Sequence, residues 1–387
     1  MSLIERNMKS NDYGQREDIL DVMVSLDEKQ TPFLSAVKKG STPRNTYVEW
    51  HVDKYADASV ANAVIDGTDV QADIQDHDGT AFYDAENHAA NRDKLATYLQ
   101  MFRRVGHVSR LAQEINVTAG VSSEYAKAVQ KKTTELGRDI EATCLGYNDH
   151  LAETSSVPYR MRGLGIWLLD SDTITNGGVK KTSAAASSTG GNIVNQLVSE
   201  VVPSAYRPSS DQTFALTSDT DASNLTETVV QDIMQSAWDA TGMNGDYKFY
   251  AGSEVRRQFT SMSRNASQSS SNFYYTQRNF EVPQTSKKIQ ETTTIYEGDF
   301  GIVEICPSNF IGQQFVQGGA DNNLTTNKTC GYLLDMDQIE LKFWKRPTVE
   351  RFEDRGGGPR FLVEAGCALC VTNPLGMGSV NSRFETS

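Results

Sequence analysis

Several features of membrane and secreted proteins are missing from this sequence. No uninterrupted apolar run approaches the roughly 20 residues that a membrane-spanning helix needs. The opening stretch MSLIERNMKS lacks the apolar core of a signal peptide. We therefore expect a protein that makes no membrane contact and matures in a cytoplasm.

Cysteine and histidine are both scarce. The five cysteines form an odd, scattered set, which argues against a disulfide framework. Cys367 and Cys370 have CxxC spacing, but they lie in the apolar run FLVEAGCALCV without a second Cys or His pair nearby. The five histidines all fall in the first 150 residues, and none has HExxH or paired-ligand spacing. We expect buried, reduced thiols and no metal site.

Motifs of catalysis and nucleotide binding are absent as well. Gly163-Leu164-Gly165 lacks the third glycine of a dinucleotide fingerprint, and Gly356-Gly357-Gly358 is not followed by the Lys and Ser/Thr of a phosphate loop. There is no GxSxG motif and no nucleophile with a recognisable base. We predict no enzyme activity and no cofactor. A hydrolase of unrecognised type is the alternative, and it would need desolvated carboxylates in a deep pocket.

An acidic stretch between residues 73 and 86 is a weak candidate for calcium binding. Aligning Gly79 with the invariant glycine of an EF-hand places Ile74 at the first ligand position and Ala85 at the bidentate one. Both residues lack a ligand oxygen in the side chain, so we expect a solvated acidic loop. Weak divalent binding stays the alternative.

The composition is that of a globular protein with an acidic surface. The 387 residues suffice for two or three units of ordinary domain size, and 38% are hydrophobic and 22% charged. The net charge of -13 opposes general attraction to phosphate backbones. Nucleic acid is therefore expected only in non-specific proximity to the chain.

Two extended runs predict a long hairpin. Tyr47–Val52 alternates, with Val48, Trp50 and Val52 on one face, and Leu95–Val108 forms a second extended run. Between them lie some forty residues rich in Ala, Asp, Asn and Gly, which cannot easily make a core. An isolated two-stranded ribbon is marginal in water, so we expect this projection to contact another molecule.

The stretch Ser122–Asn148 predicts one long helix, about 40 Å in length at about 1.5 Å per residue. Its serines can cap a first turn, and apolar residues recur at three-, four- and seven-residue spacings from Tyr125 to Tyr147, with Thr133 in the same stripe. The opposite edge is charged and includes Arg138, Asp139 and Glu141.

The C-terminal half predicts mixed helix and strand. The expected elements are a turn and short buried strand at Arg162–Leu168, a helix that begins at Asn224–Glu227 and ends at Gly242, a strand at Lys248–Ala251, a helix from Ser253 to Phe259, and strands at Ile289–Ile295, Ile302–Ile305, Ile339–Trp344 and Arg360–Val371. Pro347 and Gly356–Pro359 separate the last two strands, which we expect to be antiparallel.

Short basic pairs occur in this acidic chain, and they have two interpretations. Solvated faces are the simpler one, and ion pairing between subunits is the other. The candidate intersubunit contacts are Trp50, Arg103, Arg104, Arg138, Asp139, Glu141, Arg256, Arg257, Lys345 and Arg346.

The order of these elements resembles the HK97-like fold of tailed-bacteriophage major capsid proteins, and more narrowly the SU10-type family. The stretches that carry the resemblance are Arg16–Ile19 leading to Thr31–Ala36, Val105–Ser109 through Ala119-Gly120, Glu135–Glu141, Arg162–Leu164, Tyr296–Ile305, and Leu362–Ala365 with Cys370–Pro374.

The resemblance implies an α+β fold with an N-terminal arm (1–45), an E-loop hairpin (46–110), a P-domain spine helix region (111–158), an A-domain (159–335) and a C-terminal return to the P-domain (336–387). It also implies a major capsid protein that assembles as hexamers and pentamers into an icosahedral shell around double-stranded DNA. Scaffolding, decoration and portal proteins are expected partners, with assembly in the host cytoplasm. Another virion structural protein, such as a tail-tube, portal or head-completion subunit, is the alternative.

Overall fold

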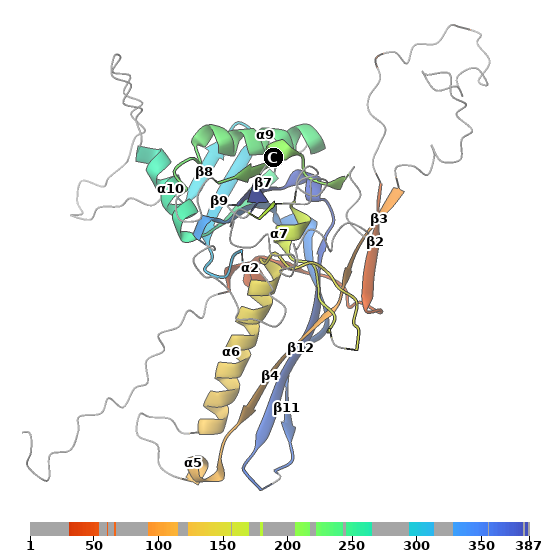
Figure 1. Ribbon diagram of the computed structural model, residues 1–387, viewed down its shortest axis with the longest axis vertical. Helices are drawn as coiled ribbons and strands as arrows, with labels where there is room; N and C mark the ends of the chain where they lie inside the picture. The colour runs from red at the N-terminus through yellow and green to blue at the C-terminus, as the bar shows by residue number, and fades with distance from the viewer. Residues whose placement is uncertain are drawn as a thin grey trace, which may run out of the picture. The chain divides into compact units, whose positions relative to one another are not determined.

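The computed structural model in Figure 1 contains both helices and strands, which confirms the α+β class. Its described residues form two compact units. The first unit is built from residues 103–136 and 347–364, and the second from 31–102, 137–346 and 365–387. The structure describes residues 31–53, 60, 66, 92–114, 123–155, 157–169, 179–180, 206–216, 222–242, 245–264, 294–312, 328–354, 356–381 and 384–385.

The second unit contains a mixed six-stranded sheet in the order β6-β13-β10-β7-β9-β8. Strand β7 pairs in parallel with β9 and antiparallel with β10, which places Phe249 between Ile305 and Leu333. The strands are β6 (Thr213–Ala215), β7 (Gly245–Ala251), β8 (Ile295–Gly298), β9 (Gly301–Pro307), β10 (Gly331–Asp335) and β13 (Gly378–Asn381).

Helices α9 (Glu227–Thr241) and α10 (Ser253–Arg264) cover one face of this sheet, as Figure 1 shows. The helix predicted from Asn224 is confirmed, but its cap is Thr226, whose hydroxyl accepts the backbone N–H of Val229. Gly242 ends it in the left-handed conformation that was expected, with φ 67°. The buried side chains between helices and sheet form the core of this unit.

The long predicted helix is α6 (Glu124–Cys144), which begins after Ser122 and ends before Asn148. It stops because the N–H of Gly146 turns back to the carbonyl of Thr143. Leu136, Ile140 and Cys144 are fully buried along one edge, as expected. Thr133 was assigned to the same stripe and is exposed instead.

A four-stranded sheet has the order β1-β11-β12-β4, with β1 (Lys38–Lys39), β4 (Gln100–His107), β11 (Ile339–Phe352) and β12 (Arg360–Val371). Pro347 was expected to end a strand, but it lies inside β11. Strand β1 pairs with β11 at Glu340 and Leu341, so Pro347 occupies an edge of the described sheet, where a missing N–H is tolerated.

In the first unit, aromatic packing joins α6 to these strands. The ring of Tyr125 meets that of Phe361 edge-on, with centroids 5.3 Å apart. The guanidinium carbon of Arg351 lies 5.6 Å from the centre of the Tyr125 ring. Gly106 of β4 leaves room for Phe361, because a Cβ atom there would lie 2.2 Å from its ring.

The predicted hairpin strands pair as β2 (Tyr47–Asp53) and β3 (Arg92–Tyr98), antiparallel, with Tyr47 opposite Tyr98. The single run predicted from Leu95 to Val108 is divided at Leu99, since β4 belongs to the four-stranded sheet. The acidic stretch between residues 73 and 86 lies outside the described residues.

One predicted strand is a helix. Residues Leu164–Trp167 form α7, in which the carbonyl of Gly163 accepts the N–H groups of Ile166 and Trp167. All four residues of α7 are buried as expected, and a short apolar run does not distinguish a strand from a helix. The remaining short elements are α2 (Pro32–Ala36), α5 (Arg110–Glu114), β5 (Val179–Lys180) and β14 (Phe384–Glu385).

Candidate intersubunit contacts and a buried polar network

The side chain of Glu141 in α6 accepts hydrogen bonds from backbone groups of its own chain. This side chain is fully buried; Oε1 accepts the backbone N–H of Phe33 at 3.0 Å, and Oε2 accepts that of Leu34 at 2.7 Å. These N–H groups open α2, where a helix has no acceptors of its own, and Thr31 makes no side-chain cap. The prediction that placed Glu141 on an exposed charged edge is therefore wrong.

Two other candidate contact residues pack on aromatic rings within the second unit. The guanidinium carbon of Arg138 lies 5.3 Å from the centre of the Phe310 ring. Trp50 is half-buried, and its ring lies 5.6 Å from that of Trp167. Both contacts stabilise the protomer, and a role between subunits stays a prediction for these residues and for the half-buried Asp139.

The predicted basic pairs have unequal surroundings. Arg103 is largely exposed, yet its Nη2 lies 3.2 Å from Oε1 of Glu364, a carboxylate that is only 8% exposed. Arg256 donates to the carbonyl of Ile305, whereas Arg257 projects outward with 82% of its side chain exposed. Arg104 and Lys345 are half-buried, and Arg346 is exposed. The structure thus leaves one member of each pair more accessible than the other.

The turn between β11 and β12 was expected from its glycines, but sequence reasoning did not identify the side chains that hold it. Asp354 accepts the N–H groups of Gly356 and Gly358 through Oδ1, and Arg110 through Oδ2 at 2.8 Å. The backbone hydrogen bonds from Gly358 and Gly356 and the one from Arg110 lower the pKa of Asp354 to about 2. An Asp followed by glycines is a signal for such a turn, although it does not identify Arg110 as the partner.

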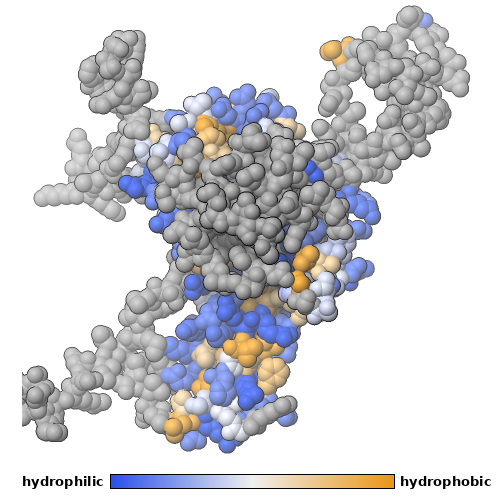
Figure 2. Space-filling view, in the orientation of Figure 1, coloured by the Kyte–Doolittle hydropathy of each residue, from blue (hydrophilic) through white to orange (hydrophobic). Residues whose placement is uncertain are grey.

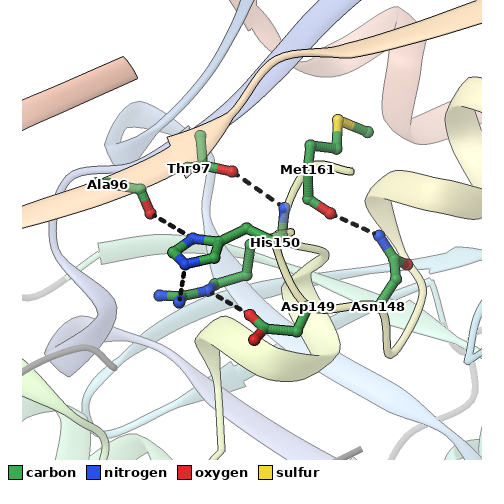
Figure 3. A network of polar contacts seen from close by, with 7 residues as sticks. Ala96, Thr97, Asn148, Asp149, His150 and Met161 are labelled. Carbon is green, nitrogen blue, oxygen red and sulfur yellow. Dashed lines mark hydrogen bonds and ion pairs between the residues drawn. The ribbon is translucent and has the colours of Figure 1, made fainter. Parts of the chain in front are cut away.

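A second unpredicted feature is a buried polar network around Arg162, drawn in Figure 3. Arg162 is 2% exposed; its Nε donates to Asp149 at 2.9 Å, and its guanidinium carbon lies 4.8 Å from the centre of the Trp167 ring. Its Nη2 lies 3.3 Å from Nε2 of His150. A buried arginine is stabilised in this way by a carboxylate, a ring and a neutral imidazole together.

The same network reaches β3 and the segment that follows α6. The backbone N–H of Arg162 donates to the Thr97 hydroxyl at 3.0 Å, and Nδ1 of His150 lies 3.2 Å from the Ala96 carbonyl oxygen. Asn148 donates to the carbonyl of Met161, which Figure 3 also shows. The network therefore fixes the base of the β2–β3 hairpin within the second unit.

The cysteines are free thiols, as expected, and four of them are buried: Cys144, Cys330, Cys367 and Cys370. Burial raises the pKa of Cys370 to about 12 and that of Cys367 still further. Cys306 is half-buried, and burial raises its pKa less. Such thiols are poor nucleophiles and poor metal ligands.

Large apolar side chains are exposed in the first unit. Val105 of β4 is 61% exposed, Phe352 of β11 is 48% exposed and Leu111 of α5 is 67% exposed. Figure 2 shows apolar patches between polar ones in the region that Figure 1 labels α5, α6 and β11. Exposed apolar groups of this kind are typical of protein interaction surfaces.

The described residues contain neither a metal-binding cluster nor a membrane-spanning helix. No group of three or more His, Cys, Asp and Glu residues is placed to hold a metal ion there. None of the helices in the described part of the chain is long and apolar enough to span a membrane.

Solved structures with similar folds are phage-type capsids. The capsid of a native GTA particle matches with a TM-score of 0.50 and 10% identity, over 99% of each chain. A capsid structure of cyanophage A-1(L) and a structure of Mycobacterium phage Ogopogo each match with a TM-score of 0.51 and 10% identity, over 95% of this chain and 96% of theirs. At this identity the likeness establishes the fold alone, an HK97-like α+β fold.

Sequence comparison establishes the family. A search of curated proteins gave no significant match. The family model described as SU10 major capsid protein matches residues 7–382, which is nearly the whole chain. The chain therefore belongs to the SU10 major capsid protein family: it is a structural protein of the phage head shell, it associates with copies of itself in the virion capsid, and it is not an enzyme.

Proposed function

We propose that this chain assembles as hexamers and pentamers into an icosahedral head shell that encloses viral double-stranded DNA. The family match over residues 7–382 carries the proposal. Subunits would join through heterologous contacts that close into a shell, and each contact can be weak because many of them act together. Assembly takes place in the host cytoplasm, with scaffolding, decoration and portal proteins as further partners.

The segments have separate roles in this proposal. The arm (1–45) and the hairpin (46–110) lie across neighbouring subunits, and the segment 159–335 lies near the local symmetry axis. Residues 111–158 and 336–387 form the body of the subunit. The coreless composition of residues 57–91 supports an intersubunit role for the hairpin tip, because such a stretch cannot be stable by itself. Its deletion is expected to leave a soluble protein that forms no shells.

Exposed residues of the first unit are assigned to contacts with a second copy of the chain. Val105 and Phe352 are apolar and accessible, and the charged Arg103 lies two residues before Val105 on β4. Of the other candidate residues, Arg257 and Arg346 are the accessible ones. Glu141 is withdrawn from the set because it is buried in its own protomer.

The packaged DNA is expected to lie against the shell without being gripped. A chain of net charge -13 gains little from phosphate neutralisation. Shells incubated with duplex DNA at physiological salt should show no retention in a filter-binding assay. Tight retention under these conditions would contradict this part of the proposal.

Electron microscopy of the full chain expressed alone tests the main proposal. Negative-stain images should show closed shells or rings of five and six subunits, whereas uniform tubes or twelve-fold rings would contradict it. Val105→Ser should reduce assembly without changing the melting temperature, because an exposed valine contributes little to folding. Val105→Ile keeps the apolar surface and is the matched control. A clean monomer from the wild-type chain leads to coexpression with a scaffolding protein, and absence of shells there as well would refute the proposal.

A further inference from the structure

The two ring nitrogens of His150 face groups of opposite hydrogen-bonding capacity, as Figure 3 shows. Nδ1 lies 3.2 Å from the carbonyl oxygen of Ala96, and Nε2 lies 3.3 Å from Nη2 of Arg162. A carbonyl can only accept a hydrogen bond, and a guanidinium can only donate one. Nδ1 must therefore carry the hydrogen and Nε2 must be the acceptor. The network requires a neutral imidazole.

A second proton on His150 would break this arrangement. It would be bound at Nε2 and would point at the guanidinium of Arg162, so that two donors and two positive charges face each other. His150 is 7% exposed and Arg162 is 2% exposed, so little water screens the repulsion. Arginine cannot relieve it by losing a proton. Protonation of His150 is therefore expected to separate the two side chains.

Arginine side chains lie close to His150 in the described part of the chain. Asp149 is the neighbour of His150 in sequence and carries a carboxylate that would favour a protonated ring, but its Oδ1 accepts a hydrogen bond from Arg162. Arg207 adds positive charge close to Arg162, since burial and that neighbour lower the pKa of Arg207. Burial also lowers the pKa of Arg160, which flanks the same segment.

Strand β3 is the element held by these contacts. Ala96 accepts the hydrogen bond from His150, and the adjacent Thr97 accepts the backbone N–H of Arg162 at 3.0 Å. The ring of Tyr98 meets the imidazole edge-on, with centroids 5.4 Å apart. Since β3 pairs with β2 from Tyr98 to Arg92, loosening this stretch frees the base of the hairpin.

We propose that His150 is an acid-sensitive latch: the neutral imidazole fastens β3, and with it the β2–β3 hairpin, to the segment that contains Arg162, and its protonation releases that attachment. The attachment is strongest at neutral pH and weakens as the pH falls below about 6.5, the ordinary pKa of a histidine side chain, because the released state then takes up a proton that the latched state opposes. Trp50 packs separately on Ala368 and Cys370, a contact that does not titrate in this range, so the release is local.

Hydrogen–deuterium exchange of the full chain tests the latch. Peptides covering residues 92–98 are compared at about pH 7.5 and about pH 5.5, after correction for the intrinsic exchange rate. The wild-type protein should lose protection by about tenfold at the lower pH, in line with the loss of buried hydrogen bonds. His150→Gln, whose side chain does not titrate, should show the same protection at both. His51→Gln replaces an exposed histidine of β2 and should behave as wild type.

Three results would overturn the proposal. One is that residues 92–98 of the wild-type protein are equally protected at both pH values. Another is that His150→Gln loses as much protection at the lower pH as the wild-type protein does. The third is an equal loss in residues 331–335 of β10, which would indicate general acid unfolding. His150→Asn replaces the glutamine variant if circular dichroism shows that the latter is misfolded, and the wild-type comparison is decisive without either. All readouts concern the protomer, so failure here leaves the proposed shell untouched.

Discussion

Oε1 of Glu141 lies 3.0 Å from the backbone nitrogen of Phe33, 108 positions earlier in the chain. Together with the contact from Leu34 to Oε2, this makes the α6 carboxylate the cap of α2. Within the second unit, α2 is thereby held against a residue of the long helix. Thr31 makes no side-chain cap that could replace this carboxylate.

Replacing Glu141 should destabilise the protein. Glu141→Ala leaves the buried N–H of Phe33 and the partly buried N–H of Leu34 without their acceptor, at a cost of about 2 to 4 kcal/mol in the free energy of unfolding. Glu141→Gln should cost somewhat less, because its amide retains one acceptor oxygen. Urea unfolding followed by circular dichroism measures both. Glu135→Gln, which removes an ion pair with Lys132 at 2.7 Å, is the control and should cost less than about 0.5 kcal/mol. Equal midpoints for Glu141→Ala and wild type would contradict the capping role.

Two glycine-to-alanine changes should shift the stability of the folded protein in opposite directions. A Cβ atom at Gly106 would lie 2.2 Å from the Phe361 ring, so Gly106→Ala should destabilise the protein by about 1 to 3 kcal/mol. Gly137 lies inside α6 with open space around its Cβ direction, so Gly137→Ala should stabilise it by up to about 1 kcal/mol. Melting temperatures of the two variants, measured by calorimetry, should move in opposite directions from wild type. A shift in the same direction would be inconsistent with these surroundings.

Thiol labelling should distinguish one cysteine from the other four. Cys306 is half-buried, whereas Cys144, Cys330, Cys367 and Cys370 are buried. With Ellman's reagent the folded protein should release about one equivalent of thiolate first, because buried thiols react only after unfolding. Cys306→Ser should abolish this early phase, and denaturant should expose all remaining thiols. An early phase that persists in Cys306→Ser would show that another cysteine is accessible.

The Asp354 turn should survive mild acid. The pKa of the Asp354 carboxyl group is lowered from 3.8 to about 2. The stabilisation linked to ionisation of this group is therefore complete above pH 3.8 and is lost as the pH falls through about 2. Carboxyl carbon NMR of aspartate-labelled protein, assigned with Asp354→Asn, measures the titration. Arg110→Ala should raise the midpoint, since its hydrogen bond is one of the causes. Arg103→Ala, which removes an ion pair with Glu364, should leave the midpoint of the Asp354 titration unchanged. A wild-type midpoint near 4 would contradict the turn geometry.

Local rules account for the elements that sequence reasoning placed correctly. Alternation predicted β2 with Val48 inside and Glu49 outside, and the helical period predicted α6 with Leu136 buried. Gly242 was expected to end α9 because the left-handed conformation there suits glycine. These features depend on neighbours within one or two turns of chain, so a single sequence contains the information. The strand predicted at α7 was wrong because a short apolar run permits either a helix or a strand. The strand end predicted at Pro347 was wrong because a proline is tolerated at the edge of a sheet.

The sequence by itself determined the order of elements and, through that order, the capsid family. Only the tertiary structure decided which polar side chains are used inside the protomer. Glu141 and Arg162 both sit among charged neighbours in sequence, yet each is buried against groups that a distant segment supplies. The hydrogen bond from His150 to Ala96 joins residues 54 positions apart, and the pair of Arg110 with Asp354 joins residues 244 apart. No spacing rule links such residues, because their proximity results from how the strands and helices pack, which the identity of neighbouring residues does not contain.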